Sequence, residues 1–516
     1  MDVMNKIKSF VLSVDVNIPE FGNNTADAER IKEAVKKDFG IDSLFIPLFV
    51  LKELPLKIRK WHNRVKLVLF KNSSGWFTVA IENPDKKQPI CGIAADIGTT
   101  RIVLRLLDLE TGKNIGETGL DNPQIMIAPD VLARIHYAEN DVGRKELQSL
   151  IVEGINSSIA SLCRSCGLDS SCVYLFCGAG NTTMTHLFFG IDPSHIIRAP
   201  YIPCVNVPEP VRALETELKI NSQAVIFLFP NIGSYFGGDL IAGILYAGLH
   251  KQENPCIMVD VGTNAEVVVG NRDWLIACAG AAGPALEGGM SDVGMTAGPG
   301  VIDKVVIDRK TGNIDVHTIE NRPAIGLCGS GMIDLAAQLF LSSMLDIRGE
   351  FLEEKCHGRL FEKNGMPCFR LVDKSSSGTG KDIVLTQADI NSLTSSKAAM
   401  YSILEVLVNN TAGLSFDDLS KFYVAGTFGS FIDPRSAISI GMLPDISMEK
   451  FEVLGNSSLG GAVKLLLDPD CLKEINEIRQ SITYIELNVN QEFMNIFSAA
   501  KFYPHTDRSR FPSVKR

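Results

Sequence analysis

One short motif occurs twice in this chain, and its repetition constrains the fold more than any other feature. An apolar, strand-like run ends in residues 96–100 (DIGTT), and another ends in residues 260–264 (DVGTN). Strand-like residues follow each copy. A pattern that recurs in one structural context predicts two related halves that face each other. Helical spacing between the copies, at residues 145–163, 208–218 and 240–249, favours an α/β architecture over an all-β one.

The first copy has the groups that a phosphate and its metal ion need. Gly98 lets the backbone turn tightly and approach an anion, and Thr99 and Thr100 offer amide and hydroxyl donors to phosphate oxygens. Asp96, at the strand end, is placed to hold Mg²⁺ through its water molecules. The second copy supplies Asp260, Gly262, Thr263 and Asn264 for the same purpose, with Asp260 as its metal-binding residue. Two such turns predict a clamp around a polyphosphate.

Glycine-rich turns later in the chain are candidates for holding a base and a ribose. A turn after an apolar strand lets the backbone lie flat against an adenosine, and amides at a helix start can face the ligand. Taken singly, each is equally typical of a tight turn or a helix cap. The residues are Gly283, Gly329, Ser330, Gly331, Gly426 and Gly429. In this order they resemble the nucleotide cleft of actin, Hsp70 and the sugar kinases, which implies duplicated ribonuclease-H-like ATPase halves around that cleft.

Hydrolysis of a nucleotide needs a group that positions water, and the sequence offers several acidic residues. Asp239 precedes the apolar stretch 240–249, so it either caps that helix or orients the attacking water. Glu266 and Glu287 are alternatives near the second motif. We take Asp239 and Glu266 as the catalytic candidates, and the sequence does not choose between them.

The chain divides at the polar, proline-flanked linker 83–89. Residues 1–88 predict a small α/β domain, a packing or docking module. Residues 89–516 predict the ATPase, with halves at about 89–255 and 256–516. The predicted local features are a strand at 9–16, helices at 26–39 and 48–60, the latter broken near Pro55, a hairpin around 72–75, an insertion at 351–381 and a peripheral tail at 503–516.

Composition excludes several classes of protein. Fifty Lys and Arg against sixty Asp and Glu give a net charge of −10, so the basic footprint of a nucleic-acid-binding protein is missing. No apolar run reaches the roughly 18 residues of a membrane-spanning helix.

Without a secretory signal we expect a cytoplasmic protein with reduced cysteines. Its one cysteine cluster, Cys163, Cys166, Cys172 and Cys177, is either a metal site or buried packing, and the apolar surroundings of Cys163 and Cys177 favour packing.

Residues 91–514 resemble the C-terminal ATPase region of the reductive activators of corrinoid proteins. The resembling stretches are 95–100, 122–125, 180–186, 259–266, 282–288, 326–331 and 424–429. Residues 1–90 look like that family's middle domain, notably at 51–55. In this context His186 is a candidate cobalt ligand, although its apolar neighbours favour the core or a cleft wall.

The resemblance implies an ATPase that drives reduction of Co(II) to Co(I) in a partner corrinoid protein. Mg²⁺ would neutralise the phosphates and a positioned water would attack, while the halves close and reopen about a hinge. Family members described as activators carry an N-terminal [2Fe–2S] domain, yet no cysteine precedes Cys91 here. We therefore expect no iron–sulfur cluster in this chain and electrons from a separate low-potential iron–sulfur protein. Whether that domain was lost or removed stays open.

Two other functions stay open from the sequence. One is a small-molecule kinase of the same superfamily, although no sugar-recognition motif is present. The other is a nucleotide-binding protein that switches partners without a redox role. The sequence also leaves open a homodimer, for which the first domain is the place to look, and it names neither the corrinoid protein nor the methyl donor.

Overall fold

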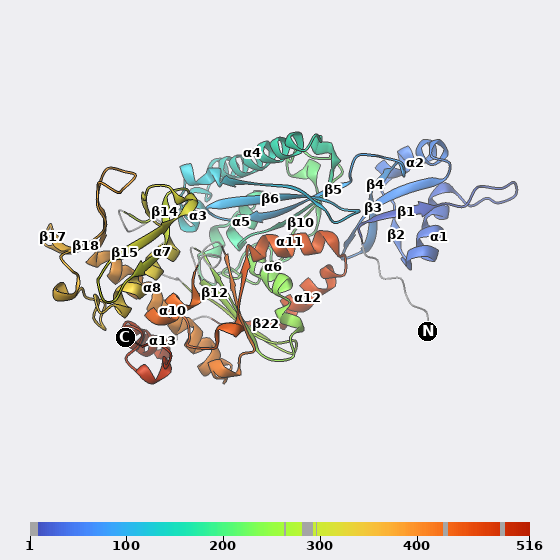
Figure 1. The fold of residues 1–516 in the computed structure, drawn as a ribbon. Helices are drawn as coiled ribbons and strands as arrows, with labels where there is room; N and C mark the ends of the chain where they lie inside the picture. The colour runs from blue at the N-terminus through green and yellow to red at the C-terminus, as the bar shows by residue number, and fades with distance from the viewer. Residues whose placement is uncertain are drawn as a thin grey trace. The chain divides into compact units, whose positions relative to one another are not determined.

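The computed structural model describes residues 9–262, 265–280, 293–295, 297–426, 432–485 and 491–515. It contains two compact units (Figure 1). One comprises Met1–Tyr246 and Ser457–Ser481, and the other comprises Ala247–Asn456 and Ile482–Arg516. In the described ranges, no helix is long and apolar enough to cross a membrane. The predicted site residues Thr263, Asn264, Gly283 and Gly429, and the alternative Glu287, lie outside these ranges.

The first unit begins with a small four-stranded sheet in the order β1-β3-β4-β2. The predicted strand, helices and hairpin are confirmed, while the edge strand β2 was not predicted. The elements are β1 (Val11–Asp15), α1 (Asp27–Phe39), β2 (Leu44–Phe45), α2 (Leu48–Lys60), β3 (Arg64–Asn72) and β4 (Gly75–Glu82).

The predicted break near Pro55 is wrong, because α2 continues through it. Val50, Leu54 and Ile58 recur every fourth residue and are all buried. Burial of this apolar stripe holds the helix together across the missing proline amide. In addition, the Arg59 guanidinium donates a 2.8 Å hydrogen bond to the Pro55 carbonyl oxygen.

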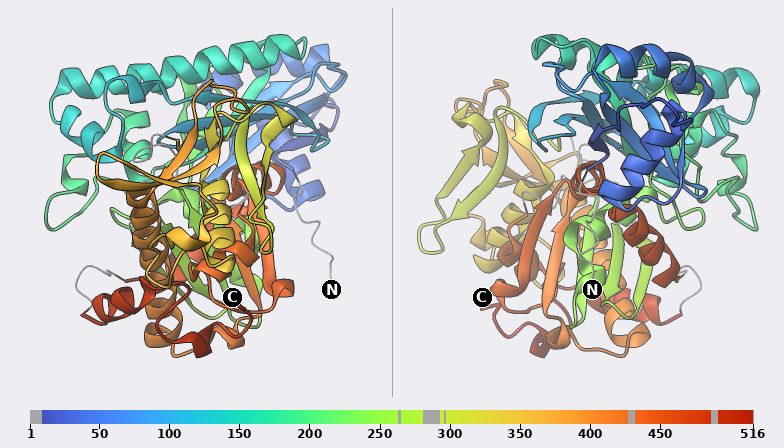
Figure 2. Two further views of the ribbon diagram at one scale, coloured as in Figure 1. Left: turned by 60° about the vertical axis from the view of Figure 1, so that its left-hand side comes forward. Right: turned by 90° about the vertical axis from the view of Figure 1, so that its right-hand side faces the viewer.

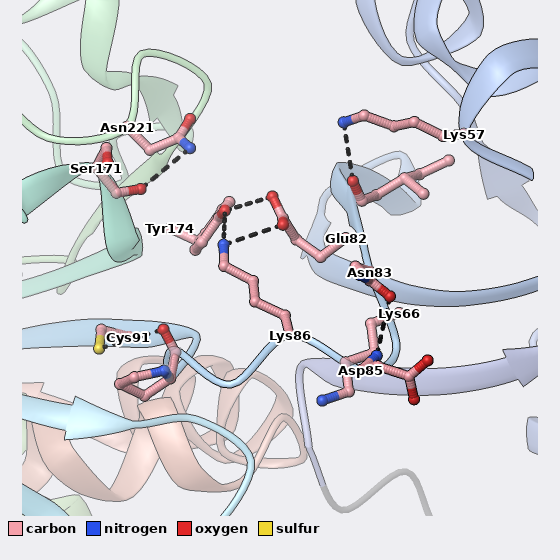
Figure 3. A network of polar contacts seen from close by, with 12 residues as sticks. Lys57, Lys66, Glu82, Asn83, Asp85, Lys86, Cys91, Ser171, Tyr174 and Asn221 are labelled. Atoms are coloured by element: carbon pink, nitrogen blue, oxygen red, sulfur yellow. Dashed lines mark hydrogen bonds and ion pairs between the residues drawn. The ribbon is translucent and has the colours of Figure 1, made fainter. Parts of the chain in front are cut away.

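A polar network connects the linker after β4 with Tyr174, a residue of the six-stranded sheet in the same unit (Figure 3). Lys86 Nζ lies 3.0 Å from Glu82 Oε2 and 3.1 Å from the Tyr174 hydroxyl. That hydroxyl also donates to Glu82. Burial, and next the hydrogen bond to Glu82, raise the pKa of Tyr174, so the phenol stays protonated. The linker is therefore a fixed connection within this unit.

The larger sheet of the first unit has the order β7-β6-β5-β8-β10-β9. Its strands are β5 (Cys91–Ile97), β6 (Arg101–Asp108), β7 (Asn114–Asp121), β8 (Val173–Ala179), β9 (Val211–Arg212) and β10 (Val225–Leu228). Its helices are α3 (Val131–Tyr137), α4 (Asp141–Ser165), α5 (Thr182–Phe189), α6 (Gly238–Ala247), α11 (Ser457–Leu467) and α12 (Cys471–Ser481).

Helices cover both faces of this sheet. Alternate residues of β5, such as Ile93 and Ala95, share one core with Ile155 of α4. Figure 2 shows α4, in teal, running along the sheet. The intervening residues face α11, since a Cβ on Gly92 would lie 3.3 Å from the Leu466 side chain. This alternation directs Asp96 to the α11 face.

The second unit has a sheet of the same design, in the order β21-β20-β11-β12-β13-β22. In both sheets the strand after the DxGT motif pairs antiparallel with the strand before it, and a later strand pairs parallel on the other side. The predicted duplication is therefore confirmed as topology. The strands are β11 (Cys256–Val261), β12 (Ala265–Gly270), β13 (Leu275–Gly280), β20 (Lys421–Ala425), β21 (Phe451–Gly455) and β22 (Ile482–Tyr484).

Two small sheets and several helices complete the second unit. The predicted short strands of residues 351–381 are present as β17 and β18. The elements are β14 (Val301–Ile307), β15 (Ile314–Thr318), β16 (Gly326–Leu327), α7 (Gly329–Leu341), β17 (Leu360–Lys363), β18 (Met366–Val372), β19 (Ile383–Thr386), α8 (Gln387–Glu405), α10 (Pro434–Ile440) and α13 (Gln491–Ala500).

Two further predictions of local structure are wrong. Residues 208–218 do not form a helix, because Pro210 cannot donate a helical hydrogen bond and Val211–Arg212 instead pair with β10 as β9. Residues 503–515 are not a peripheral tail. Tyr503 and Phe511 are buried in the core of the second unit, where their apolar surface outweighs the polar composition around them.

The C-terminal segment is held by a buried lysine. Lys397 of α8 is fully buried, and its Nζ donates to the main-chain oxygens of Ala500 at 2.6 Å and Pro504 at 3.0 Å, and also to that of Phe502. Burial lowers the pKa of Lys397 well below its usual value. The three carbonyl groups replace the water that the ammonium loses.

Candidate functional site

The hairpin between β5 and β6 carries the first motif, and its geometry requires glycine. A Cβ on Gly98 would lie 2.4 Å from the Arg101 carbonyl oxygen, which is closer than any side chain tolerates. The sequence suggested that Gly98 makes room for an anion. The hairpin itself already demands a glycine, because its two backbone strands approach so closely here.

Three side chains hold this hairpin from the rest of the unit. Asn122 Nδ2 donates to the Gly98 carbonyl oxygen at 2.9 Å, and Arg134 Nη2 donates to the Thr99 carbonyl oxygen at 2.7 Å. Asn181 Nδ2 donates to the Thr99 hydroxyl at 3.0 Å. We call Asn122, Arg134 and Asn181 the bracket. It fixes the loop before any ligand arrives, which lowers the ordering cost of binding.

Arg134 is a fully buried guanidinium in the short helix α3. Besides Thr99 it donates to the Ala128 carbonyl oxygen at 3.0 Å and to Gln124 Oε1 at 3.1 Å. Burial lowers its pKa to about 10, so it remains charged at neutral pH. A permanent positive charge directly behind the loop favours anion binding. Asn122 and Asn181 lie in the resembling stretches, whereas nothing in the sequence pointed to Arg134.

Replacing Arg134 with methionine is expected to destabilise the protein by about 3 kcal/mol, because three buried oxygens lose a charged donor. Chemical denaturation followed by circular dichroism measures this change. Arg144→Met is the matched control, since Arg144 pairs with the exposed Asp141 on α4 and such a pair contributes about 0–1 kcal/mol. Equal stability of both variants would contradict the role given to the bracket.

Two carboxyl groups lie together on the α11 face of the first unit. Asp96 is the penultimate residue of β5, and the Ser458 hydroxyl donates to its Oδ1 at 2.9 Å. Asp239 lies in the first turn of α6, where its Oδ1 accepts from the Leu240 amide at 2.9 Å. Burial, and next the charge of Asp96, raise the pKa of Asp239 to about 6. Asp239 thus satisfies an amide at the helix start and also neighbours the motif carboxylate.

The oxygen groups at this place fit a magnesium ion that arrives with a nucleotide. Mg²⁺ in nucleotide sites uses one or two carboxylates, with water and phosphate oxygens as its other ligands. Asp96 provides such a carboxylate, Thr99 and Thr100 add hydroxyls, and Asp239 lies beside them as a group that can accept a proton. Across the described ranges no cluster of three or more His, Cys, Asp or Glu is arranged to hold a metal by itself. The donor set therefore fits a shared ion better than a fully protein-bound one.

The second unit brings four of the predicted residues together around its own motif. Asp260 of β11 is the direct cross-strand partner of Glu266 on β12. A Cβ on Gly426 would lie 2.6 Å from Asp260 Oδ1, and Gly426 has a φ of 87°, so this strand end also requires glycine. Gly262 follows directly after β11. The ends of β11 and β20 thus form the second cluster of predicted residues.

Gly329, Ser330 and Gly331 form the start of α7 and lie in a packed region. A Cβ on Gly331 would lie 2.2 Å from the Ile302 carbonyl oxygen of β14. The Ser330 hydroxyl lies 3.1 Å from Cys328 Sγ and is buried. The structure thus gives these residues a packing role, and their contact with a nucleotide stays a prediction.

The cysteine cluster and His186 lie in the core. Cys163 and Cys172 belong to the apolar core of the first unit, and the pKa of Cys163 is raised by its hydrogen bond with Cys172 and by burial. Cys177 is buried, while Cys166 is half-buried. His186 is fully buried with its Nδ1 2.7 Å from the Thr182 carbonyl oxygen, and burial lowers its pKa. These positions favour the packing interpretation.

Duplicated sheets with a carboxylate at the end of the first strand define an ASKHA-type protein, the class that includes sugar kinases and actin. Family models agree with this architecture. The model described as the C-terminal domain of RACo, the ASKHA domain, matches residues 254–515. The models of the RACo middle region and linker region match residues 91–252 and 9–88. The first domain is thus similar to the linker region, which corrects its expected likeness to the middle domain.

Curated relatives and a solved structure agree with the family models. The corrinoid activation enzyme RamQ of Eubacterium limosum is 32% identical over 425 residues, covering 81% of this chain and 71% of RamQ. The [Co(II) methylated amine-specific corrinoid protein] reductase of Methanosarcina barkeri is 25% identical, covering 79% and 76%. A solved reductive activator for corrinoid, iron–sulfur protein matches 98% of this chain and 80% of its own, with 36% identity and a TM-score of 0.88. The chain belongs to the family of reductive activators of corrinoid proteins.

Proposed function

We propose that this protein uses ATP hydrolysis to drive the reduction of Co(II) to Co(I) in a partner corrinoid protein. The proposal is supported by the family to which the chain belongs and by relatives named for corrinoid activation and for Co(II) corrinoid protein reduction. The observation that carries the ATP-dependent part is the braced hairpin at Gly98 with Asp96 and Asp239 beside it.

Each residue of this site has a separate task in the proposed reaction. The amides and hydroxyls of Thr99 and Thr100 bind phosphate oxygens, and the bracket keeps the loop in place. Asp96 orients the water shell of the metal, and Asp239 accepts the proton of the attacking water as ATP and water become ADP and phosphate. Mg²⁺, when bound, neutralises phosphate charge. Glu266, opposite Asp260, is the alternative water-positioning residue.

The redox step is separate from hydrolysis. One electron from a low-potential donor, which we infer to be a separate iron–sulfur protein, converts Co(II) to Co(I). ATP hydrolysis contributes through a conformational change that alters the affinity for the corrinoid protein, since a ligand shifts an equilibrium only by binding two states differently. The expected turnover is modest, because the useful product is an altered partner.

The test combines this protein, a Co(II) corrinoid protein from a methyltransferase system, and titanium(III) citrate as the low-potential donor. We expect Co(I) absorption only when Mg-ATP is present, and phosphate release that the Co(II) protein stimulates. A cobalt spectrum that ATP leaves unchanged would contradict the proposal. A phosphorylated metabolite would instead indicate a kinase, and tight ATP binding without turnover would indicate a partner switch.

A further inference from the structure

Ser458 contacts Asp96 from a part of the chain far away in sequence. Its hydroxyl donates to Asp96 Oδ1 at 2.9 Å, and the residue is buried, with 6% of its surface exposed. It lies in the first turn of α11, where the positive end of the helix dipole favours a neighbouring carboxylate. Asp96 is therefore held by a donor that a water molecule cannot easily replace.

The position of Ser458 is fixed by close packing of α11 on α6. A Cβ on Gly461 would lie 2.2 Å from the Ala242 carbonyl oxygen, so the two helix backbones touch. Farther along, Lys464 Nζ donates to the Leu245 carbonyl oxygen at 2.7 Å. Because α6 also carries Asp239, the two helices form one block that places Ser458 and Asp239 beside Asp96.

The same block lies where the chain passes between the two units. The first unit is interrupted after Tyr246, near the end of α6, and resumes at Ser457, the first residue of α11. Ser458 is thus the second residue of the segment in which the chain re-enters the first unit. One hydrogen bond joins the Asp96 carboxylate to the segment that follows this connection.

We propose that Ser458 is a positioning residue that orients Asp96 for Mg-nucleotide binding and links that binding to the connection at residues 456–457. The inference rests on the proposed nucleotide-binding function. A hydrogen bond between the hydroxyl and Oδ1 fixes the rotation of the carboxylate, so that its other oxygen has one preferred direction. A metal that is shared with phosphates needs such a preset direction, because its octahedral geometry tolerates little deviation.

The test is ATP binding to the full chain, measured by calorimetry in Mg²⁺ and in EDTA. We expect Ser458→Ala to weaken binding about tenfold in Mg²⁺, as for a lost hydrogen bond to a charged group, and to leave binding in EDTA unchanged. Ser458→Thr keeps the hydroxyl and should restore affinity. Ser165→Ala is the matched control, since that hydroxyl makes only local contacts in the described structure, with the Leu162 carbonyl oxygen at 2.8 Å and Cys166 Sγ at 3.8 Å. Ser458→Cys serves the same comparison if the alanine variant fails to fold.

Hydrogen exchange tests the link to the connection. Mg-ATP should slow amide exchange at residues 95–101 in both wild type and Ser458→Ala, but at residues 454–460 only in the wild type. Unchanged affinity of Ser458→Ala in Mg²⁺, an equal loss in Mg²⁺ and EDTA, or equal protection of residues 454–460 in both proteins would overturn the inference alone. A wild type that does not bind ATP would overturn the proposed function together with it.

Discussion

Replacing Asp96 with asparagine is expected to remove the magnesium-dependent part of ATP binding while the fold persists. Asparagine keeps the size of the side chain and can still meet the Ser458 hydroxyl, but it loses the charge that holds the water shell of the metal. We expect a loss of about 100-fold in affinity for Mg-ATP, at the upper end of what altered metal shells cost. The measurement is the increase in thermal unfolding midpoint that Mg-ATP produces, which should disappear in the variant.

A surface carboxylate provides the control for this experiment. Asp42 has 76% of its side chain exposed and pairs with Lys36 on the surface, so Asp42→Asn should respond to Mg-ATP as the wild type does. Equal stabilisation of the wild type, Asp42→Asn and Asp96→Asn would remove Asp96 from the site. The unliganded variants should have similar circular dichroism spectra, which separates a lost ligand from a lost fold.

The second large effect is expected from Asp239→Asn, which should lower the hydrolysis rate by about 10²–10³-fold, as for a lost general base. Mg-ATP affinity should change little, because the asparagine still accepts the Leu240 amide that Asp239 accepts now. Single-turnover phosphate release and calorimetry measure the two quantities separately. An unchanged rate would leave Asp239 with helix capping alone and would make Glu266 the next candidate.

The same residue predicts the pH dependence of the wild type. A base acts only when ionised, and the pKa of Asp239 is about 6, so the hydrolysis rate should rise with pH and reach half its maximum near pH 6. The charge of Asp96 contributes to this raised pKa. The residual activity of Asp96→Asn should therefore have its half-maximum at a lower pH. A pH profile that stays flat between pH 5 and 8 would contradict proton acceptance by Asp239.

The parts of the fold that the sequence predicted are those that depend on local patterns. The repeated motif follows a buried strand in both units, and the strand order repeats with it. The hydrophobic spacing at residues 145–163 likewise lies within α4. Residues 208–218 have similar spacing, but their prolines favour pairing at the sheet edge. A periodic pattern predicts an element well only where the backbone amides are free to form it.

The residues that the sequence missed are recognisable only through contacts between distant segments. Arg134 has the pattern of a surface residue on a short helix, yet the fold buries it behind the loop at Thr99. Ser458 lies 362 positions from Asp96 and follows no motif. Neither contact can be deduced from neighbours in the chain. The contact between Ser458 and Asp96 forms because α11 packs on α6 and on the strands of the larger sheet.

The buried ammonium of Lys397 has a consequence for how the protein can be shortened. Its acceptors are carbonyl groups at Ala500, Phe502 and Pro504, so a chain that stops before them would leave a desolvated cation inside the second unit. An unpaired ammonium in such surroundings is very costly, and the neutral amine that forms when it loses its proton would still lack hydrogen-bond partners. Removing these C-terminal residues to help crystallisation is thus expected to destabilise the second unit, rather than to change only its surface.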